Sequence, residues 1–328
     1  MTRGIIESAL LCFVALMLWG YSMRVFERCA GHSLVAKDTS RIMVWLNEND
    51  SKGEDRHVIF GSSNVACALD PDELDSLTND RWFNNGQLGM TDFELIDYSF
   101  SCLENFALGE VQHVYIELVS TPISEKNWDW RSAELITFQS ILQIALTESK
   151  GSLMSGVKDA LQLILMKTAG PLHRTLHEGK ELIRRSPNGA MPDENRMWHV
   201  KTASDSVHLE EIESVRARSV EIWNNLSEVT DIEFKANQFP YPRLHDVVAL
   251  CEEKEMEVTF LFCPTTSIGE HVKHVVQTYD LPLFLLDFGL AESPFIMPKW
   301  MRDPIHLNKD GAVRVSENFA SYLKERQN

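Results

Sequence analysis

A series of short apolar runs, alternating with segments of helical periodicity, constrains the fold of this chain more than any other feature. Five runs have the length and composition of buried strands: HVIF at 57–60, RWFNN at 81–85, VQHVYIELV at 111–119, VTFLFC at 258–263 and LPLFLLDF at 281–288. Apolar residues repeat at helical spacing between them, at 91–107, 240–255 and 268–279. Strands that alternate with helices predict a parallel sheet with right-handed crossovers.

The stretch from about 121 to 238 departs from this alternation. Its pattern is mostly helical, and it contains a break rich in Pro, Gly and Asn at 186–195. We expect an insertion between the third and fourth strands, of the kind that often covers a site at the strand ends. Within it, 152–185 has one apolar and one basic face, which is typical of a core-facing helix pair or of a helix on a membrane surface.

The N-terminal segment is apolar enough to meet a membrane. Residues 4–23 are mostly apolar, and Trp19 and Tyr21 suit the interface of a bilayer. We predict a membrane anchor, with a cleaved signal peptide as the alternative. The few charged residues on either side leave the orientation of this segment open. The predicted organisation is an anchor at 1–30, a stalk and linker at 31–56 with a helix at 33–49, and a domain at 57–328.

Charge and cysteine usage exclude several classes of function. The formal net charge is −17, and an acidic surface repels the phosphate backbone of nucleic acids, so we predict no nucleic-acid binding. The six cysteines show no CxxC or Cys/His spacing that would indicate zinc, and they favour structural thiols. We therefore predict neither a metal site nor a cofactor.

The segment before the last helical pattern carries the residues most specific for chemistry. Asp303 and His306 are three residues apart, and Pro304 biases Asp303 away from helix. A tight turn there can bring the carboxylate against one ring nitrogen of His306 and leave the other nitrogen as a base. Asn308 is a good N-cap for the final helix. The alternative is a capping turn without chemistry.

Ser63 is the candidate nucleophile. It follows the first predicted strand directly, after Gly61 and Ser62. Ligands of open α/β sheets bind beyond the carboxyl ends of the strands, so a serine in the loop after that strand meets substrate. Serines also populate such turns without any catalytic role. The pairing with an Asp-x-x-His segment near the other end of the chain favours the catalytic interpretation.

These segments together resemble the SGNH (GDSL-like) hydrolase superfamily. The resemblance assigns three segments to the first, second and fifth family blocks: GSSN at 61–64, FNNGQLGM at 83–90 and DPIHLNKDGA at 303–312. In the family's pattern Ser63 is the nucleophile, Asp303 and His306 are the acid and base, and the amides of Ser63 and Gly89 form the oxyanion hole. The match covers the sheet core, about half of the chain, and its fifth block is the most specific part.

The resemblance also implies a fold and a substrate class. It implies a flavodoxin-like three-layer α/β/α sandwich with about five parallel strands, a helical insertion and an N-terminal transmembrane helix. The membrane-tethered branch of the family includes proteins that add or remove O-acetyl groups on extracellular polysaccharides. An O-acylated glycan, or another small ester, is therefore the expected substrate, and a periplasmic or otherwise extracytoplasmic domain the expected location.

This chain does not match the third block of the family. Its usual asparagine, which completes the oxyanion hole, has no counterpart in YIELVSTPI at 115–123. Losing one such donor typically lowers the rate by about 10²–10³-fold. Candidate substrate-lining residues from the three blocks and their surroundings are Asn64, Asn85, Glu117, Ser120 and Trp128.

Several alternatives stay open from the sequence. The chain could hydrolyse the ester or transfer its acyl group, and its protein partners are undetermined. A catalytically impaired SGNH-like scaffold in polysaccharide export is the second hypothesis, supported by the missing asparagine. A cytosol-facing lipid esterase is a third. The α/β-hydrolase fold is disfavoured because it requires G-x-S-x-G, whereas this chain has G-S-S-N-V at 61–65.

Overall fold

The structure is a computed structural model of the 328-residue chain. The residues it describes are 14, 18, 19, 21, 22, 34–48, 54–87, 90, 92–118, 130–146, 153–177, 243–263, 283–285, 300–302 and 306–327. The predicted helix at 268–279 lies outside these ranges.

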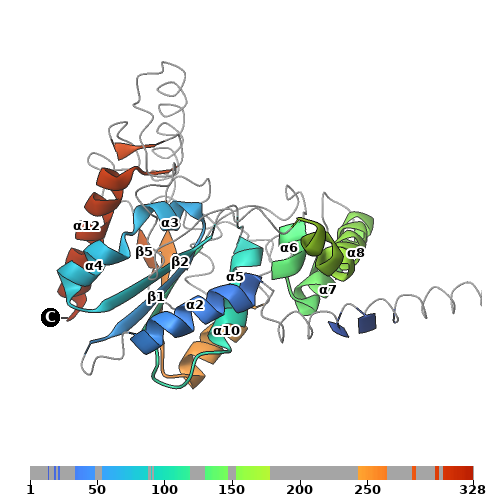
Figure 1. Ribbon diagram of the computed structural model, residues 1–328, viewed down its shortest axis with the longest axis horizontal. Coiled ribbons are helices and arrows are strands. Elements are labelled where there is room, and N and C mark those ends of the chain that lie inside the picture. The colour runs from blue at the N-terminus through green and yellow to red at the C-terminus, as the bar shows by residue number, and fades with distance from the viewer. Residues whose placement is uncertain are drawn as a thin grey trace, which may run out of the picture.

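The strands form one parallel sheet at the centre of the domain (Figure 1). They are β1 (Arg56–Gly61), β2 (Arg81–Gly86), β3 (His113–Glu117), β4 (Glu257–Phe262) and β5 (Leu283–Leu285). Their order is β2-β1-β3-β4-β5, and every neighbouring pair runs parallel. The predicted α/β class with a parallel sheet is thus confirmed. The carboxyl ends of all strands lie at one edge, where a ligand site is expected.

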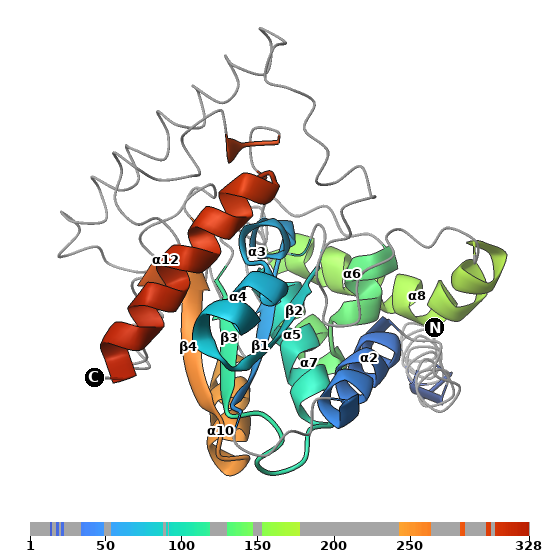
Figure 2. The ribbon, with the colours of Figure 1, turned by 60° about the vertical axis from the view of Figure 1, so that its left-hand side comes forward.

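One face of the sheet is covered by α3 (Ser63–Ala68), α4 (Pro71–Thr78) and α12 (Lys309–Gln327) (Figure 2). Buried aromatic rings hold this layer together. The Phe319 ring of α12 meets Trp82 and Tyr115 edge-on, with centroid distances of 5.7 and 5.3 Å. Burial of large aromatic side chains dominates core energetics, so this packing fixes α12 and the chain that leads into it against the sheet.

The other face is covered by α2 (Leu34–Glu48), α5 (Asp92–Leu103) and α10 (Leu244–Glu253). Ile42, Trp45 and Leu46 of α2 are fully buried or nearly so, and the Trp45 ring lies 5.4 Å from that of Phe83. The helix expected at 33–49 is present, but it packs on the domain instead of standing apart as a stalk. Apolar residues at helical spacing form one face, and that face joins the core.

Three helices occupy the described part of the predicted insertion: α6 (Trp130–Leu135), α7 (Phe138–Leu146) and α8 (Leu153–His177). They share a small apolar core that includes Ile141, Ile144 and Leu163. The core-facing packing expected for 152–185 is present, but the described part of this range is one helix, α8, that packs on α6 and α7, and not a helix pair. The outer side of α7 and α8 also exposes large apolar side chains: Leu142, Leu146, Met154, Leu161 and Leu165.

Most of the predicted anchor lies outside the described residues. Of residues 4–23, the structure describes Val14, Leu18, Trp19, Tyr21 and Ser22, and the first four expose their apolar side chains. Within the described ranges, no helix combines the length and apolar character needed to cross a bilayer. An anchor in 1–30 therefore stays a prediction.

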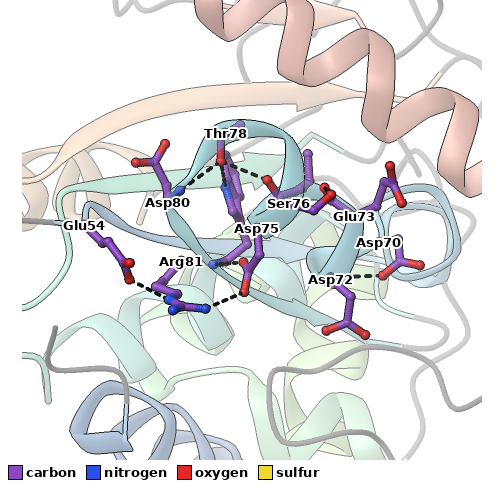
Figure 3. A network of polar contacts seen from close by, with 11 residues as sticks. Glu54, Asp70, Asp72, Glu73, Asp75, Ser76, Thr78, Asp80 and Arg81 are labelled. Carbon is purple, nitrogen blue, oxygen red and sulfur yellow. Dashed lines mark hydrogen bonds and ion pairs between the residues drawn. The ribbon is translucent and has the colours of Figure 1, made fainter.

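A polar network joins α4 to the start of β2 (Figure 3). Asp75 accepts a hydrogen bond from the backbone N–H of Trp82 at 2.8 Å and pairs with the Arg81 guanidinium at 3.5 Å. Arg81 also pairs with Glu54 at 2.7 Å. Burial raises the pKa of Asp75 from 3.8 to about 6, although the Trp82 N–H and the Arg81 charge oppose the rise.

The raised pKa of Asp75 predicts a pH dependence of stability. A carboxyl group with a higher pKa in the folded than in the unfolded chain stabilises the fold only while it is protonated. This contribution is fully present below pH 3.8 and is lost as the pH rises through about 6. We expect wild type to lose up to about 3 kcal/mol relative to Asp75→Asn between pH 4 and 7. Urea unfolding across this range measures the difference.

The control for this experiment is Asp310→Asn, which removes an exposed carboxylate from α12. Its unfolding free energy should run parallel to that of wild type over the same pH range. A parallel curve for Asp75→Asn as well would contradict the assignment of the raised pKa to Asp75.

Candidate functional site

Ser63 is the first residue of α3, directly beyond the carboxyl end of β1. The sequence predicted a loop at this point, whereas the chain turns into a helix within one residue. Ser62 is the N-cap, and its Oγ accepts a hydrogen bond from the Asn64 N–H at 3.1 Å. A serine N-cap satisfies a donor that the helix itself leaves open. Ser63 is thereby held by a strand on one side and by a capped helix on the other.

Close packing around two glycines allows this sharp turn. A Cβ on Gly61 would lie 2.5 Å from the Cβ of Val65, and one on Gly86 would lie 2.7 Å from both the backbone N and the Cβ of Ala66. Real Cβ atoms essentially never come this close. The ends of β1 and β2 can therefore approach α3 only because both positions lack a side chain.

His306 lies in a short turn that precedes α12. An antiparallel bridge joins Met301 to Leu307, and the Arg302 N–H donates to the His306 carbonyl at 2.9 Å. The Asn308 side chain then accepts from the Gly311 N–H at 2.9 Å, so Asn308 caps α12 as predicted. These contacts hold the backbone at His306 and Leu307 against Met301 and Arg302, and they thereby help to position the imidazole.

The structure brings His306 and Ser63 together. His306 Nε2 lies 2.8 Å from Ser63 Oγ, although 243 residues separate the two in sequence. This is the hydrogen-bond distance at which a histidine can take the proton of a serine hydroxyl. Both side chains are partly exposed, so a substrate can reach them from solvent.

The second ring nitrogen of His306 has a neighbour that the sequence did not indicate. Arg302 Nη2 lies 3.4 Å from His306 Nδ1. A guanidinium group has only donors, so a hydrogen bond between these two atoms would need Nδ1 as the acceptor. A base needs the opposite tautomer, with Nδ1–H donated to an acceptor. Asp303, the predicted acceptor, lies outside the described residues.

Glu117 ends β3 beside the candidate nucleophile. Its side chain is fully buried, and Glu117 Oε2 accepts a hydrogen bond from the Ser62 N–H at 2.5 Å. The carboxylate therefore links the end of β3 to the N-cap of α3. The sequence suggested Glu117 as a substrate-lining residue, and in the structure it bonds to Ser62, the residue before Ser63. Glu117 thereby helps to position the turn between β1 and α3.

Residues of the second block, in β2 and directly after it, support the turn from the other side. The Gln87 N–H donates to the Gly61 carbonyl at 2.6 Å. Asn84 is buried, and its amide donates to the carbonyls of Val65 at 3.2 Å and Leu69 at 2.7 Å. Asn84 thus ties the middle and the C-terminal end of α3 to β2, a function that sequence inspection missed because both acceptors are backbone atoms.

Asn85, predicted to line the substrate site, belongs to a buried polar network. Its amide donates to Tyr98 Oη at 2.9 Å, and Tyr98 donates to Asp38 at 2.6 Å. Gln87 bonds to the same groups. Burial raises the pKa of Tyr98 well above 10.0, and the charge of Asp38 raises it further, so Tyr98 stays a donor. This network joins α2, β2 and α5.

Asn64 has a different environment from Asn85. It is buried beside Ser63, and its Oδ1 has no hydrogen-bond partner among the described residues. Buried polar atoms are nearly always paired, so an unpaired acceptor next to the candidate nucleophile is a notable exception. Gly89, Ser120 and Trp128, the other predicted site residues, lie outside the described ranges.

Comparison with known proteins does not assign the chain to a family. A scan against protein-family models and a search of curated proteins gave no match to the chain.

Proposed function

We propose that this chain is an SGNH-type serine esterase or O-acyltransferase that acts on an O-acylated, in particular acetylated, glycan. The observation that carries the proposal is the 2.8 Å separation of His306 Nε2 and Ser63 Oγ across 243 residues of sequence. A nucleophile and a base at this distance form the central part of a covalent acyl-transfer site.

The proposed reaction is a double displacement. His306 Nε2 takes the proton of Ser63 Oγ as the oxygen attacks the ester carbonyl. The bond to the leaving alcohol then breaks, and His306 returns the proton to that alcohol. Water or a sugar hydroxyl next attacks the acyl-serine with the same base, which regenerates Ser63. In the family's pattern Asp303 orients His306, and the amides of Ser63 and Gly89 hold the oxyanion.

The topology of the sheet supports this location for the site. The order β2-β1-β3-β4-β5 is the flavodoxin-like order, in which ligands bind beyond the carboxyl ends of the strands at the switch point between β1 and β3. Ser63 follows β1 and Glu117 ends β3. The proposed nucleophile thus lies at the position where this fold class places its ligands.

The proposed substrate and location rest on the sequence. The apolar segment at 4–23 and the resemblance to membrane-tethered polysaccharide-modifying proteins favour a membrane-anchored, extracytoplasmic protein that acts on a glycan.

Two contacts favour the second candidate, a scaffold that binds glycan without catalysis. A hydrogen bond from Arg302 to His306 Nδ1 would use the nitrogen whose proton a catalytic histidine donates to its acidic partner. In the family's pattern, an asparagine after the third strand donates to the oxyanion. At the end of this strand the present chain has Glu117, whose Oε2 accepts a hydrogen bond from the Ser62 N–H. In the family's pattern, a working enzyme has Asp303 accept the proton of His306 Nδ1.

A fluorophosphonate probe, which reacts only with an activated serine, tests the proposed function. We expect covalent labelling of wild type and none of Ser63→Ala. Ser62→Ala is the matched control, because it removes the neighbouring hydroxyl and keeps the nucleophile. It should lose about 1 kcal/mol of stability with its N-cap and still be labelled. A wild-type protein that the probe does not label would favour the scaffold.

A further inference from the structure

Three potential metal ligands gather at the edge of the sheet opposite to Ser63. Asp55 directly precedes β1, His57 is the second residue of β1, and Asp80 directly precedes β2. One ligand atom from each lies within 4.8 Å of the others. The strands are parallel neighbours, with Arg56 opposite Arg81, so the residues at their starts meet at one edge. Asp55 and His57 are two apart, which places them on the same face of an extended chain.

His57 is the member of the cluster whose hydrogen-bonding groups are not satisfied. It is only 7% exposed, and neither ring nitrogen has a hydrogen-bond partner among the described residues. The ring stacks on Trp82 with a centroid distance of 4.2 Å and an interplanar angle of 10°. The stack fixes the plane of the imidazole. A buried polar group without a hydrogen bond is costly, and a metal bond would remove that cost.

The distance between His57 and Asp80 fits a shared ion better than a hydrogen bond. His57 Nε2 lies 3.5 Å from Asp80 Oδ2, beyond the usual range for an N–H···O bond. Two ligand atoms bound to one tetrahedral metal at about 2.0–2.1 Å are separated by about 3.3 Å. Small movements of exposed Asp55 and of the Asp80 side chain, which is 20% exposed, would complete the coordination.

We propose that Asp55, His57 and Asp80 bind a divalent metal ion of the zinc class. One imidazole and two carboxylates suit such an ion, and water can take the fourth position. The ion would join the start of β1 to the start of β2. The sequence did not indicate this site because Asp80 is distant from the Asp-x-His pair, and only the sheet register brings them together.

Zinc titration of the full-length, chelator-treated protein in detergent tests the proposal. Isothermal titration calorimetry with zinc chloride should show one saturable site in wild type. Asp80→Asn and Asp55→Asn should each weaken binding by at least about tenfold. Glu54→Gln is the matched control: it removes the same charge next to Asp55, but its carboxylate pairs with Arg81 at 2.7 Å. It should bind zinc like wild type.

Thermal unfolding gives a second measurement, which does not depend on catalysis. Saturating zinc should raise Tm by about 5 °C for wild type, Glu54→Gln and Ser63→Ala, and by much less for Asp80→Asn. The proposal is overturned if wild type binds no zinc, or if Asp80→Asn and Asp55→Asn bind it as tightly as wild type. If Asp80→Asn lowers Tm while zinc has no effect on any variant, His57 and Asp80 form an ion pair only.

Discussion

Replacing His306 with alanine should lower the rate of acetyl-ester hydrolysis by at least about 10³-fold. The reason is that Nε2 of His306 lies 2.8 Å from Ser63 Oγ, and without this base the serine keeps its proton at neutral pH. Initial rates on a chromogenic acetyl ester measure the effect. His245→Ala is the control, because it removes an exposed histidine from α10 and should leave the rate unchanged.

Two further variants of the same turn examine which group orients the imidazole. Asp303→Ala should lower the rate, since it removes the acceptor predicted for Nδ1. Arg302→Ala should keep most of the rate, because a guanidinium group 3.4 Å from Nδ1 cannot accept the proton of that nitrogen. Equal rates for wild type and His306→Ala would contradict the proposed base. A large loss on Arg302→Ala would instead make Arg302 a positioning residue.

Gly86→Ala should destabilise the fold by about 1–3 kcal/mol and also reduce labelling of Ser63 by the fluorophosphonate probe. A Cβ at this position would lie 2.7 Å from the backbone N of Ala66 and 2.8 Å from its Cα. Backbone atoms cannot rotate away, so α3 must move, and Ser63 at its start moves with it. Urea unfolding gives the stability, and the rate of probe labelling reports the displacement.

Gly109→Ala is the control that separates a loss of stability from a displacement of Ser63, the two effects expected of Gly86→Ala. Gly109 has a φ of +72°, so alanine there is strained, but no atom lies within 4 Å of the added Cβ. We expect a loss of about 1 kcal/mol with no change in labelling once the protein is folded. A Gly86→Ala protein that is labelled as fast as Gly109→Ala would show that α3 tolerates the extra methyl group.

The features that could be predicted from sequence are those with a local or periodic signal. The β-branched run around Val114 and Ile116 indicated a strand, and Asn308 before a helical pattern indicated a cap; both are present. The partnership of Ser63 with His306 was predicted from resemblance, because no local signal links residues so far apart. Their hydrogen-bond distance in the structure agrees with that prediction, while their catalytic role stays a proposal.

The features that could not be predicted depend on contacts between distant side chains. The apolar face of α2 gave no indication of whether it would join this core, since the same periodicity suits a stalk that packs elsewhere. Arg302 carries no signal for a contact with His306 Nδ1, which arises only from the closure of the turn. The Tyr98–Asp38 bond joins residues 60 positions apart and likewise has no local pattern.

The 243 residues between Ser63 and His306 have a consequence for the order in which the protein is made. A nascent chain presents the serine early, but the histidine and the helix that fixes it emerge only after every strand of the sheet. A chain that is interrupted, or that a protease has trimmed, ahead of His306 carries a nucleophile without its base. Such a chain cannot attack an ester, so the proposed activity begins only when synthesis has passed α12.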